Sequence, residues 1–73
     1  MAIDYNSLLT IEQKTEILNG RIRQFAAEAY QISLNKQTAV ELDSAEQIEK
    51  IDESLLMLEK AIEVHQKELA QLA

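Results

Sequence analysis

The chain has no cysteine, no proline and no tryptophan, and it has a single glycine, Gly20. Without cysteine, a disulfide framework and a cysteine-ligated zinc module are both excluded. A β-sandwich or barrel needs regular turn residues and a phosphate-binding loop needs several glycines, so neither fits one glycine and no proline. The longest apolar run is the four residues 55–58, far too short to cross a bilayer. These absences leave an all-helical chain.

The 73 residues suffice for one small domain, and their charge is unevenly distributed. The chain has 13 acids and 7 bases, a net charge of −6. Residues 1–36 hold four acids and four bases, whereas residues 37–73 hold nine acids and three bases. An acidic surface repels phosphate backbones, so we expect no bulk nucleic acid and no anionic membrane as partner. Residues 1–5 lack the features of a signal peptide, and we expect a cytoplasmic protein.

The first predicted helix spans about 11–40, after a short arm at 1–9. Residues 10–13 have the pattern of a capping box, in which the Thr10 hydroxyl accepts the backbone N–H of Gln13 and the Gln13 side chain accepts the N–H of Thr10. Apolar residues then recur at helical spacing, at Ile11, Leu18, Ile22, Phe25, Ala29 and Ile32.

The second predicted helix spans about 44–71, with Asp43 or Ser44 as its N-cap. Eight positions at heptad spacing predict the stripe by which it packs: Ile48, Ile51, Leu55, Leu58, Ile62, His65, Leu69 and Leu72. The pairs Glu46–Lys50 and Glu63–Lys67 have the spacing and order that favour ion pairs on a helix.

Two helices of similar length with a short connection predict an antiparallel hairpin, one domain over 1–73. Its core is expected from Ile48, Ile51, Leu55, Leu58, Ile62 and Leu69. With a hinge near residue 42, residues whose numbers add up to about 84–86 face one another. This register places Phe25 against Leu58 and Ile62, and His65 beside Asn19 and Gly20.

A hairpin of this size gains only about 3–5 kcal/mol from one core, and the chain has more apolar side chains than one stripe uses. We therefore expect self-association, most simply a dimeric four-helix bundle, with a larger oligomer or a bundle with another protein as alternatives. The candidate interface residues are Phe25, Ala26, Ala29, Tyr30, Met57, Ala61 and Val64. The other interpretation is a monomer with scattered exposed apolar residues, which are common on protein surfaces.

His65 is the only histidine of the chain. In the expected register it lies near Asn19, with Glu16 one turn away, and such surroundings favour a pH-sensitive contact. The simpler interpretation is a structural histidine that bonds to Asn19 or Glu16, with Gly20 leaving room for the ring.

Two further hypotheses concern charge. Arg21, Arg23 and Tyr30, repeated in several copies, form a candidate site for a small anion or nucleotide. Alternatively, these bases pair with nearby acids. The acids of the second helix suggest an inhibitor that imitates DNA and occludes a nucleic-acid-binding protein, although lysines interrupt their spacing. These acids are Glu46, Glu49, Glu53, Glu59 and Glu63.

The residues that catalysis and metal binding need are missing from the pattern. The chain has no cysteine nucleophile, and its four serines are explained by the arm, a cap and helix faces. A di-iron bundle needs a Glu-x-x-His motif, but the residue three before His65 is Ile62. We therefore expect no enzyme, no metal site and no cofactor.

Residues 9–14 (LTIEQK), 25–30 (FAAEAY) and 61–65 (AIEVH) together resemble small helical-hairpin proteins encoded by tailed phages, cyanophages among them. The resemblance covers most of the chain. It implies an accessory protein of the virion or a protein that binds a host factor, in the host cytoplasm or on the virion. It assigns a function to no particular residue.

Overall fold

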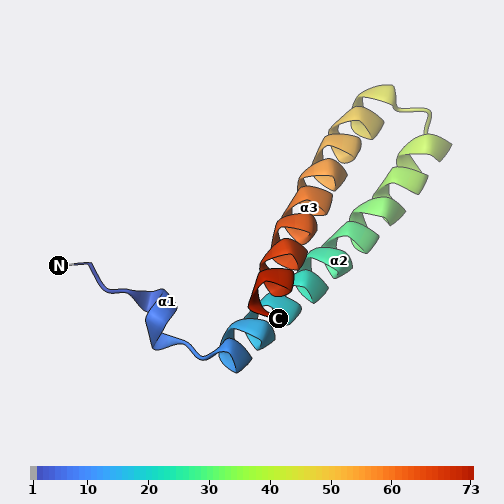
Figure 1. Ribbon diagram of the computed structural model, residues 1–73. Helices are drawn as coiled ribbons and strands as arrows, with labels where there is room; N and C mark the ends of the chain where they lie inside the picture. Colours follow the sequence, from blue (N-terminus) through green and yellow to red (C-terminus); the bar gives the residue numbers. More distant parts are fainter. Residues whose placement is uncertain (1) are drawn as a thin grey trace.

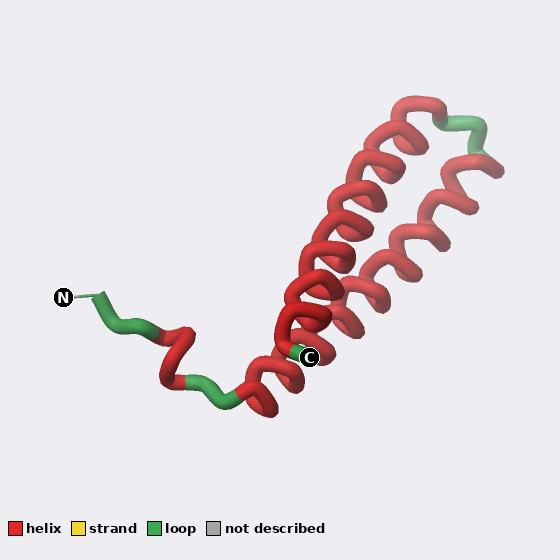
Figure 2. Tube along the Cα trace, viewed as in Figure 1, coloured by secondary structure: helices red, strands yellow, loops and turns green. Residues whose placement is uncertain are grey.

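The computed structural model describes residues 2–73, which form three helices: α1 (Tyr5–Leu8), α2 (Ile11–Glu41) and α3 (Ala45–Leu72) (Figure 1). The two long helices pack antiparallel against each other, and a short connection joins them at one end (Figure 2). This arrangement confirms the all-α hairpin. The predicted bounds differ from the observed ones by one residue, at the end of α2 and at both ends of α3.

The predicted capping box begins α2. The backbone N–H of Gln13 donates to the Thr10 hydroxyl over 3.0 Å, and the N–H of Thr10 donates to the Gln13 side chain over 2.9 Å. Both bonds satisfy backbone donors that have no partner inside the helix. Glu12 lies in the first turn, where the positive end of the helix dipole favours a carboxylate.

The connection between α2 and α3 is a Schellman turn. The N–H of Ser44 donates to the carbonyl of Ala39, and the N–H of Asp43 donates to the carbonyl of Val40, each over 3.0 Å. Such a turn needs a residue with positive φ, and Asp43 fills this position with φ 54°. Asp43 therefore ends α2, whereas Ser44 is the N-cap of α3, with no hydrogen bond from its side chain to the helix.

The predicted stripe of α3 is the side that faces α2. All eight of its heptad positions are half-buried, as are Leu18, Ile22, Phe25, Ala29 and Ile32 on α2. Ile11 does not belong to this contact, because 63% of it is exposed. Ala39 is 1% exposed and is the only fully buried residue among residues 2–73.

The register of the hairpin differs from the predicted one. Lys36 forms an ion pair of 2.6 Å with Asp52, and the rings of Phe25 and His65 lie 5.1 Å apart. These numbers add up to 88 and 90, so at these two pairs α2 meets a later part of α3 than expected.

The arm before α2 contains a helical turn that the sequence analysis did not predict. Asp4 caps α1, because the backbone N–H of Ser7 donates to its carboxylate over 3.4 Å. This turn lies apart from the body of the hairpin (Figure 1). Its apolar side chains are exposed, among them Tyr5 and Leu8 at 77% and 72%.

Candidate functional site

The exposed apolar surface is the main feature of the hairpin. Among residues 2–73, thirteen large apolar side chains are more than a third exposed: Ile3, Tyr5, Leu8, Leu9, Ile11, Ile17, Tyr30, Leu34, Val40, Leu42, Leu56, Met57 and Val64. The accessible surface is 6020 Å². A globular monomer of this mass exposes about 4,600 Å². The hairpin thus exposes about 1,400 Å² more than a compact chain of equal size.

The shape explains this excess. The radius of gyration is 16.6 Å, and the smallest of the three extents is 15 Å. A compact chain of this length has a radius of gyration of about 11 Å. Two helices side by side form a single layer, so neither of its broad sides is covered by another element.

Two hollows lined by residues of both long helices show which side of α2 adjoins which side of α3. One hollow, of about 220 Å³, is lined by Glu28, Ile32, Ser54, Met57 and Leu58. The other, of about 180 Å³, is lined by Tyr5, Asn6, Leu9, Lys14, Ile17, Leu18 and Glu68. Eleven residues, about three helical turns, separate Ile17 from Glu28 on α2. The same number separates Met57 from Glu68 on α3. Both hollows therefore open on the same side of the hairpin.

We call this side the Val64 flank, because Val64 follows Met57 by two turns and lies near its centre. By helical spacing it comprises Lys14, Ile17, Arg21 and Glu28 of α2 and Glu46, Lys50, Glu53, Ser54, Met57, Ala61, Val64 and Glu68 of α3. It therefore combines apolar residues from both helices with three bases and four acids.

The opposite side is the Tyr30 flank. Tyr30 and Ala26 are each two residues from Glu28, and two residues correspond to about 200° around a helix. By the same spacing this flank comprises Arg23, Ala26, Tyr30, Ser33 and Val40 of α2 and Asp52, Leu56, Glu59 and Glu63 of α3. It too combines apolar residues from both helices, and its carboxylates come from α3.

The seven candidate interface residues therefore do not form one surface. Phe25 and Ala29 are half-buried between the two helices. Ala26 and Tyr30 lie on the Tyr30 flank, and Met57, Ala61 and Val64 lie on the Val64 flank. The set divides between opposite sides of the hairpin, so a single flat contact cannot include all of it.

The surroundings of His65 differ from the expected ones. Its ring meets the Phe25 ring edge to face at an interplanar angle of 75°, and its Nδ1 donates to the carbonyl of Ala61 over 2.6 Å. Asn19 and Glu16 are exposed, and neither bonds to the ring. The predicted hydrogen bonds of His65 to these two residues are therefore not formed. A pH-dependent role of His65 stays a prediction.

The surroundings of Gly20 also differ from the expected ones. A Cβ atom at this position would have no heavy atom within 4 Å, apart from the neighbours and the backbone of its own helix. The space beside Gly20 is therefore open, and the histidine ring does not fill it.

The three residues of the anion hypothesis do not converge within one chain. The Arg21 guanidinium lies over the Phe25 ring, 5.5 Å from its centre, within the range of a cation–π contact. Arg23 is exposed and two residues further on, so it points in a different direction. Tyr30 is 66% exposed on the Tyr30 flank. Convergence would require several copies of the chain.

The acids of α3 are mostly exposed, and lysines accompany several of them. The predicted pairs Glu46–Lys50 and Glu63–Lys67 are both present at 3.4 Å, and Lys60 lies 3.6 Å from Glu63. The pKa of Glu63 lies below its ordinary value because Lys67 donates a hydrogen bond to it and Lys60 adds positive charge. This pairing interrupts the row of carboxylates that imitation of a DNA backbone requires.

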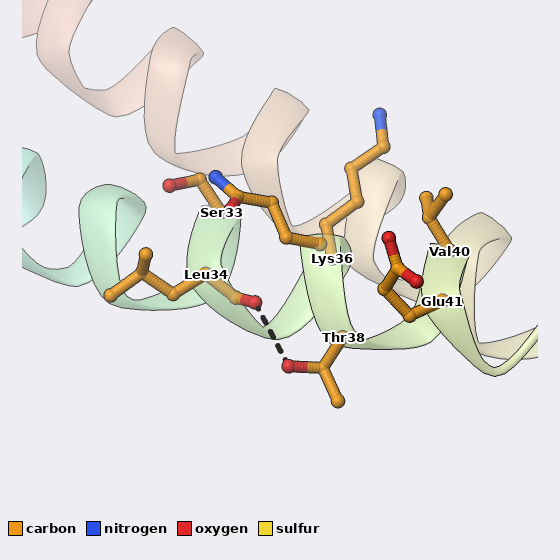
Figure 3. A pocket seen from close by; sticks show the side chains of 7 residues that line it. Ser33, Leu34, Lys36, Thr38, Val40 and Glu41 are labelled. Carbon is orange, nitrogen blue, oxygen red and sulfur yellow. Dashed lines mark hydrogen bonds between the residues drawn. The ribbon is translucent and has the colours of Figure 1, made fainter.

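A third hollow, of about 730 Å³, lies along the last turns of α2 and is lined by that helix alone (Figure 3). Lys36 and Val40 point to one side of the helix, and the Thr38 hydroxyl on the other side donates to the Leu34 carbonyl over 3.3 Å. One helix cannot enclose a ligand, so this hollow is open helix surface.

Within residues 2–73, no three histidine, aspartate or glutamate side chains come together as metal ligands do. In the same part of the chain, no helix has the length and apolar character that a bilayer span requires.

Comparison of the chain with protein-family models, with curated proteins and with solved structures gives no match. The surface of the hairpin is therefore the guide to its function.

Proposed function

We propose that this chain is a non-enzymatic interaction module that associates with copies of itself and acts through protein–protein contacts. One observation supports the proposal above all: Ala39 is the only fully buried residue among residues 2–73, while thirteen large apolar side chains are exposed. The resemblance to helical-hairpin proteins of tailed phages extends the proposal to an accessory role in a virion or toward a host protein.

The energetic reason is the small core. Full burial of a large aliphatic side chain contributes about 1.5–3 kcal/mol relative to an exposed one, and the side chains between α2 and α3 are only half-buried. The conformational entropy of each ordered residue opposes folding by about 1–2 kcal/mol. A second hairpin that covers one broad side converts half-buried residues into buried ones and forms a four-helix bundle.

The available area agrees with such a contact. A stable interface removes about 800 Å² from each partner. Two helices of about 40 Å in length and 20 Å in combined width present about that area on each side. The hairpin exposes enough excess surface to supply one such contact and still remain hydrated elsewhere.

Sedimentation equilibrium over a range of protein concentrations tests the proposal. We expect a mass of at least twice the 8.3 kDa of one chain at micromolar concentration, and a decrease in helicity by circular dichroism on dilution. A mass of 8.3 kDa throughout this range, with unchanged helicity, would contradict self-association.

A further inference from the structure

We propose that Asn19 is a site of spontaneous deamidation, and that α2 protects it while the helix is intact. Asn19 directly precedes Gly20, the only glycine of the chain. The modification depends only on α2 and on water, so it does not require the proposed self-association. Its product marks each chain in which this part of α2 has opened.

The reaction needs no enzyme and no cofactor. The backbone nitrogen of Gly20 loses its proton to water and attacks the side-chain carbonyl carbon of Asn19, so that a new C–N bond forms. The side-chain amide nitrogen takes up a proton and leaves as ammonia. Water then opens the resulting five-membered succinimide at either of its two carbonyl groups. The products are aspartate and isoaspartate, and each carries one more negative charge than asparagine.

Among the three asparagines of the chain, Asn19 has the least obstructed neighbour. The residues that follow Asn6 and Asn35 are serine and lysine, whose side chains hinder the approach of the backbone nitrogen. Gly20 has no Cβ and the widest choice of backbone dihedral angles, so it reaches the geometry of attack most easily. Asn19 is exposed, and packing against α3 leaves the space beside Gly20 open.

The intact helix opposes this reaction in two ways. Asn19 and Gly20 lie inside α2, where each backbone N–H donates to the carbonyl four residues earlier, so the proton of the attacking nitrogen is held in a hydrogen bond. The succinimide ring also fixes ψ of Asn19 outside the α-helical region, so this dihedral angle must rotate before the ring can close. Both obstacles disappear when the helix opens locally.

The position of Asn19 makes such opening accessible. Glycine inside a helix lowers the stability of the helix relative to alanine. Asn19 also lies more than five helical turns before the buried Ala39 and the turn that joins the two helices. Local openings far from the best-packed region need less free energy than global unfolding. The rate of deamidation at Asn19 therefore reports how often this part of α2 opens.

Isoaspartate would change α2 permanently. Its main chain is one carbon atom longer than that of asparagine, so the regular ladder of backbone hydrogen bonds cannot continue through residue 19. The first turns of α2, which the capping box of Thr10 begins, would then be separated from the rest of the helix. A chain that has been open long enough to react thus cannot regain the original hairpin.

Peptide mass spectrometry over time tests the proposal on the wild-type chain. The chain is incubated in a neutral buffer with and without urea, and deamidation is measured at each asparagine. We expect Asn19 to be the fastest site in urea and to react at least tenfold more slowly without it. Folding should slow Asn6 less than threefold, because α1 has only four residues and is exposed. Equal rates at Asn19 in the two buffers, or a faster reaction at Asn6 in urea, would overturn the proposal.

Two variants test the chemistry, and circular dichroism checks that both are helical. Gly20→Ala places a Cβ beside the attacking nitrogen, so deamidation at Asn19 should slow at least tenfold even in urea. Asn19→Gln would need a six-membered ring, which closes more slowly, and should remove the signal at this position while Asn6 reacts as before. Isoaspartate among the products of wild type identifies the succinimide route. An unchanged rate in Gly20→Ala, or products without isoaspartate, would contradict attack by the Gly20 nitrogen.

Discussion

The two ends of the hairpin are stabilised in different ways. At the closed end, two backbone hydrogen bonds of the Schellman turn, the buried Ala39 and the ion pair of Lys36 with Asp52 fix both helices within a few residues. At the open end, the capping box of Thr10 stabilises α2 alone, and the arm before it does not pack on the hairpin.

This difference shows that, in a single layer of two helices, each end depends on the contacts formed at that end. At the closed end, a short connection limits where the two helices can go, so a single alanine is enough to fill the contact. Toward the open end, only side chains join the helices, and these are half-buried because no third element covers them. A second copy that covers one broad side would bury more of these half-buried side chains.

The largest effect is expected from Ala39→Leu, which breaks the tight contact at the closed end. Ala39 is 1% exposed, so the larger side chain has no space and must displace α3. We expect a loss of about 1–3 kcal/mol in the free energy of unfolding, measured by denaturant titration at a fixed protein concentration. Ala27→Leu, at an exposed position of the same helix, is the control. Equal stability of the two variants would show that the closed end is not tightly packed.

A smaller effect is expected from Thr10→Ala at the open end. This change removes the acceptor for the Gln13 backbone N–H and should lower stability by about 1 kcal/mol. Amide hydrogen exchange should accelerate in the first turn of α2 and stay unchanged near Ala39. Thr38→Ala removes a hydroxyl that bonds only within its own helix, so it should not lower stability. Unchanged exchange in Thr10→Ala would contradict a role for the capping box.

Gly20→Ala should stabilise the part of α2 toward the open end, and so reduce the difference in stability between the two ends. The added Cβ meets no heavy atom within 4 Å, and alanine restricts the unfolded chain more than glycine does. We expect a gain of about 0.4–1 kcal/mol in the free energy of unfolding. A loss would mean that another chain approaches the helix at Gly20.

The smallest effect concerns pH. The pKa of Glu63 is lower in the folded chain than its ordinary value of 4.5. Its stabilisation is therefore complete above that value and is lost as the pH falls through the folded pKa. Glu63→Gln should flatten the decrease of stability in this acid range, as thermal unfolding at several pH values would reveal. Glu59→Gln, at a position with no ion pair among residues 2–73, is the control; an identical response would exclude the lysine contacts as the cause.

Much of the fold follows from patterns within each helix. All eight heptad positions predicted on α3 are half-buried, with Ala61 as a ninth, and residues 10–13 predicted the cap of α2 together with both of its hydrogen bonds. These patterns depend on neighbours three or four residues apart, whose interactions are nearly independent of the rest of the chain.

The turn was harder to predict. A Schellman turn usually has glycine at the position with positive φ, and this chain has Asp43 there. Aspartate before serine instead suggested two candidate N-caps. His65 lies against Phe25 rather than beside Asn19, and spacing within one helix did not predict this contact between helices. The cap of α1 does have a signal in the sequence, since Asp4 precedes Ser7 by three residues.

The candidate surface was only partly predictable. Periodicity identified Tyr30 and Val64 as apolar residues beside the stripe of each helix. Which flank of α2 adjoins which flank of α3 depends on the direction in which the turn bends the chain, and helical spacing within one helix carries no information on it. The interface set therefore combined two opposite sides of the hairpin.

The Schellman turn has a further consequence, for the order of folding. Of the two hydrogen bonds in this turn, the one between Ser44 and Ala39 spans more residues. The first contact between the two helices therefore closes a loop of only a few residues. The entropy lost on closing a loop rises with its length, and contacts near the turn are therefore the least costly to form. The helices are expected to come together from residues 39–44 toward the termini. Native-state hydrogen exchange should be slowest near the turn and fastest at the open end.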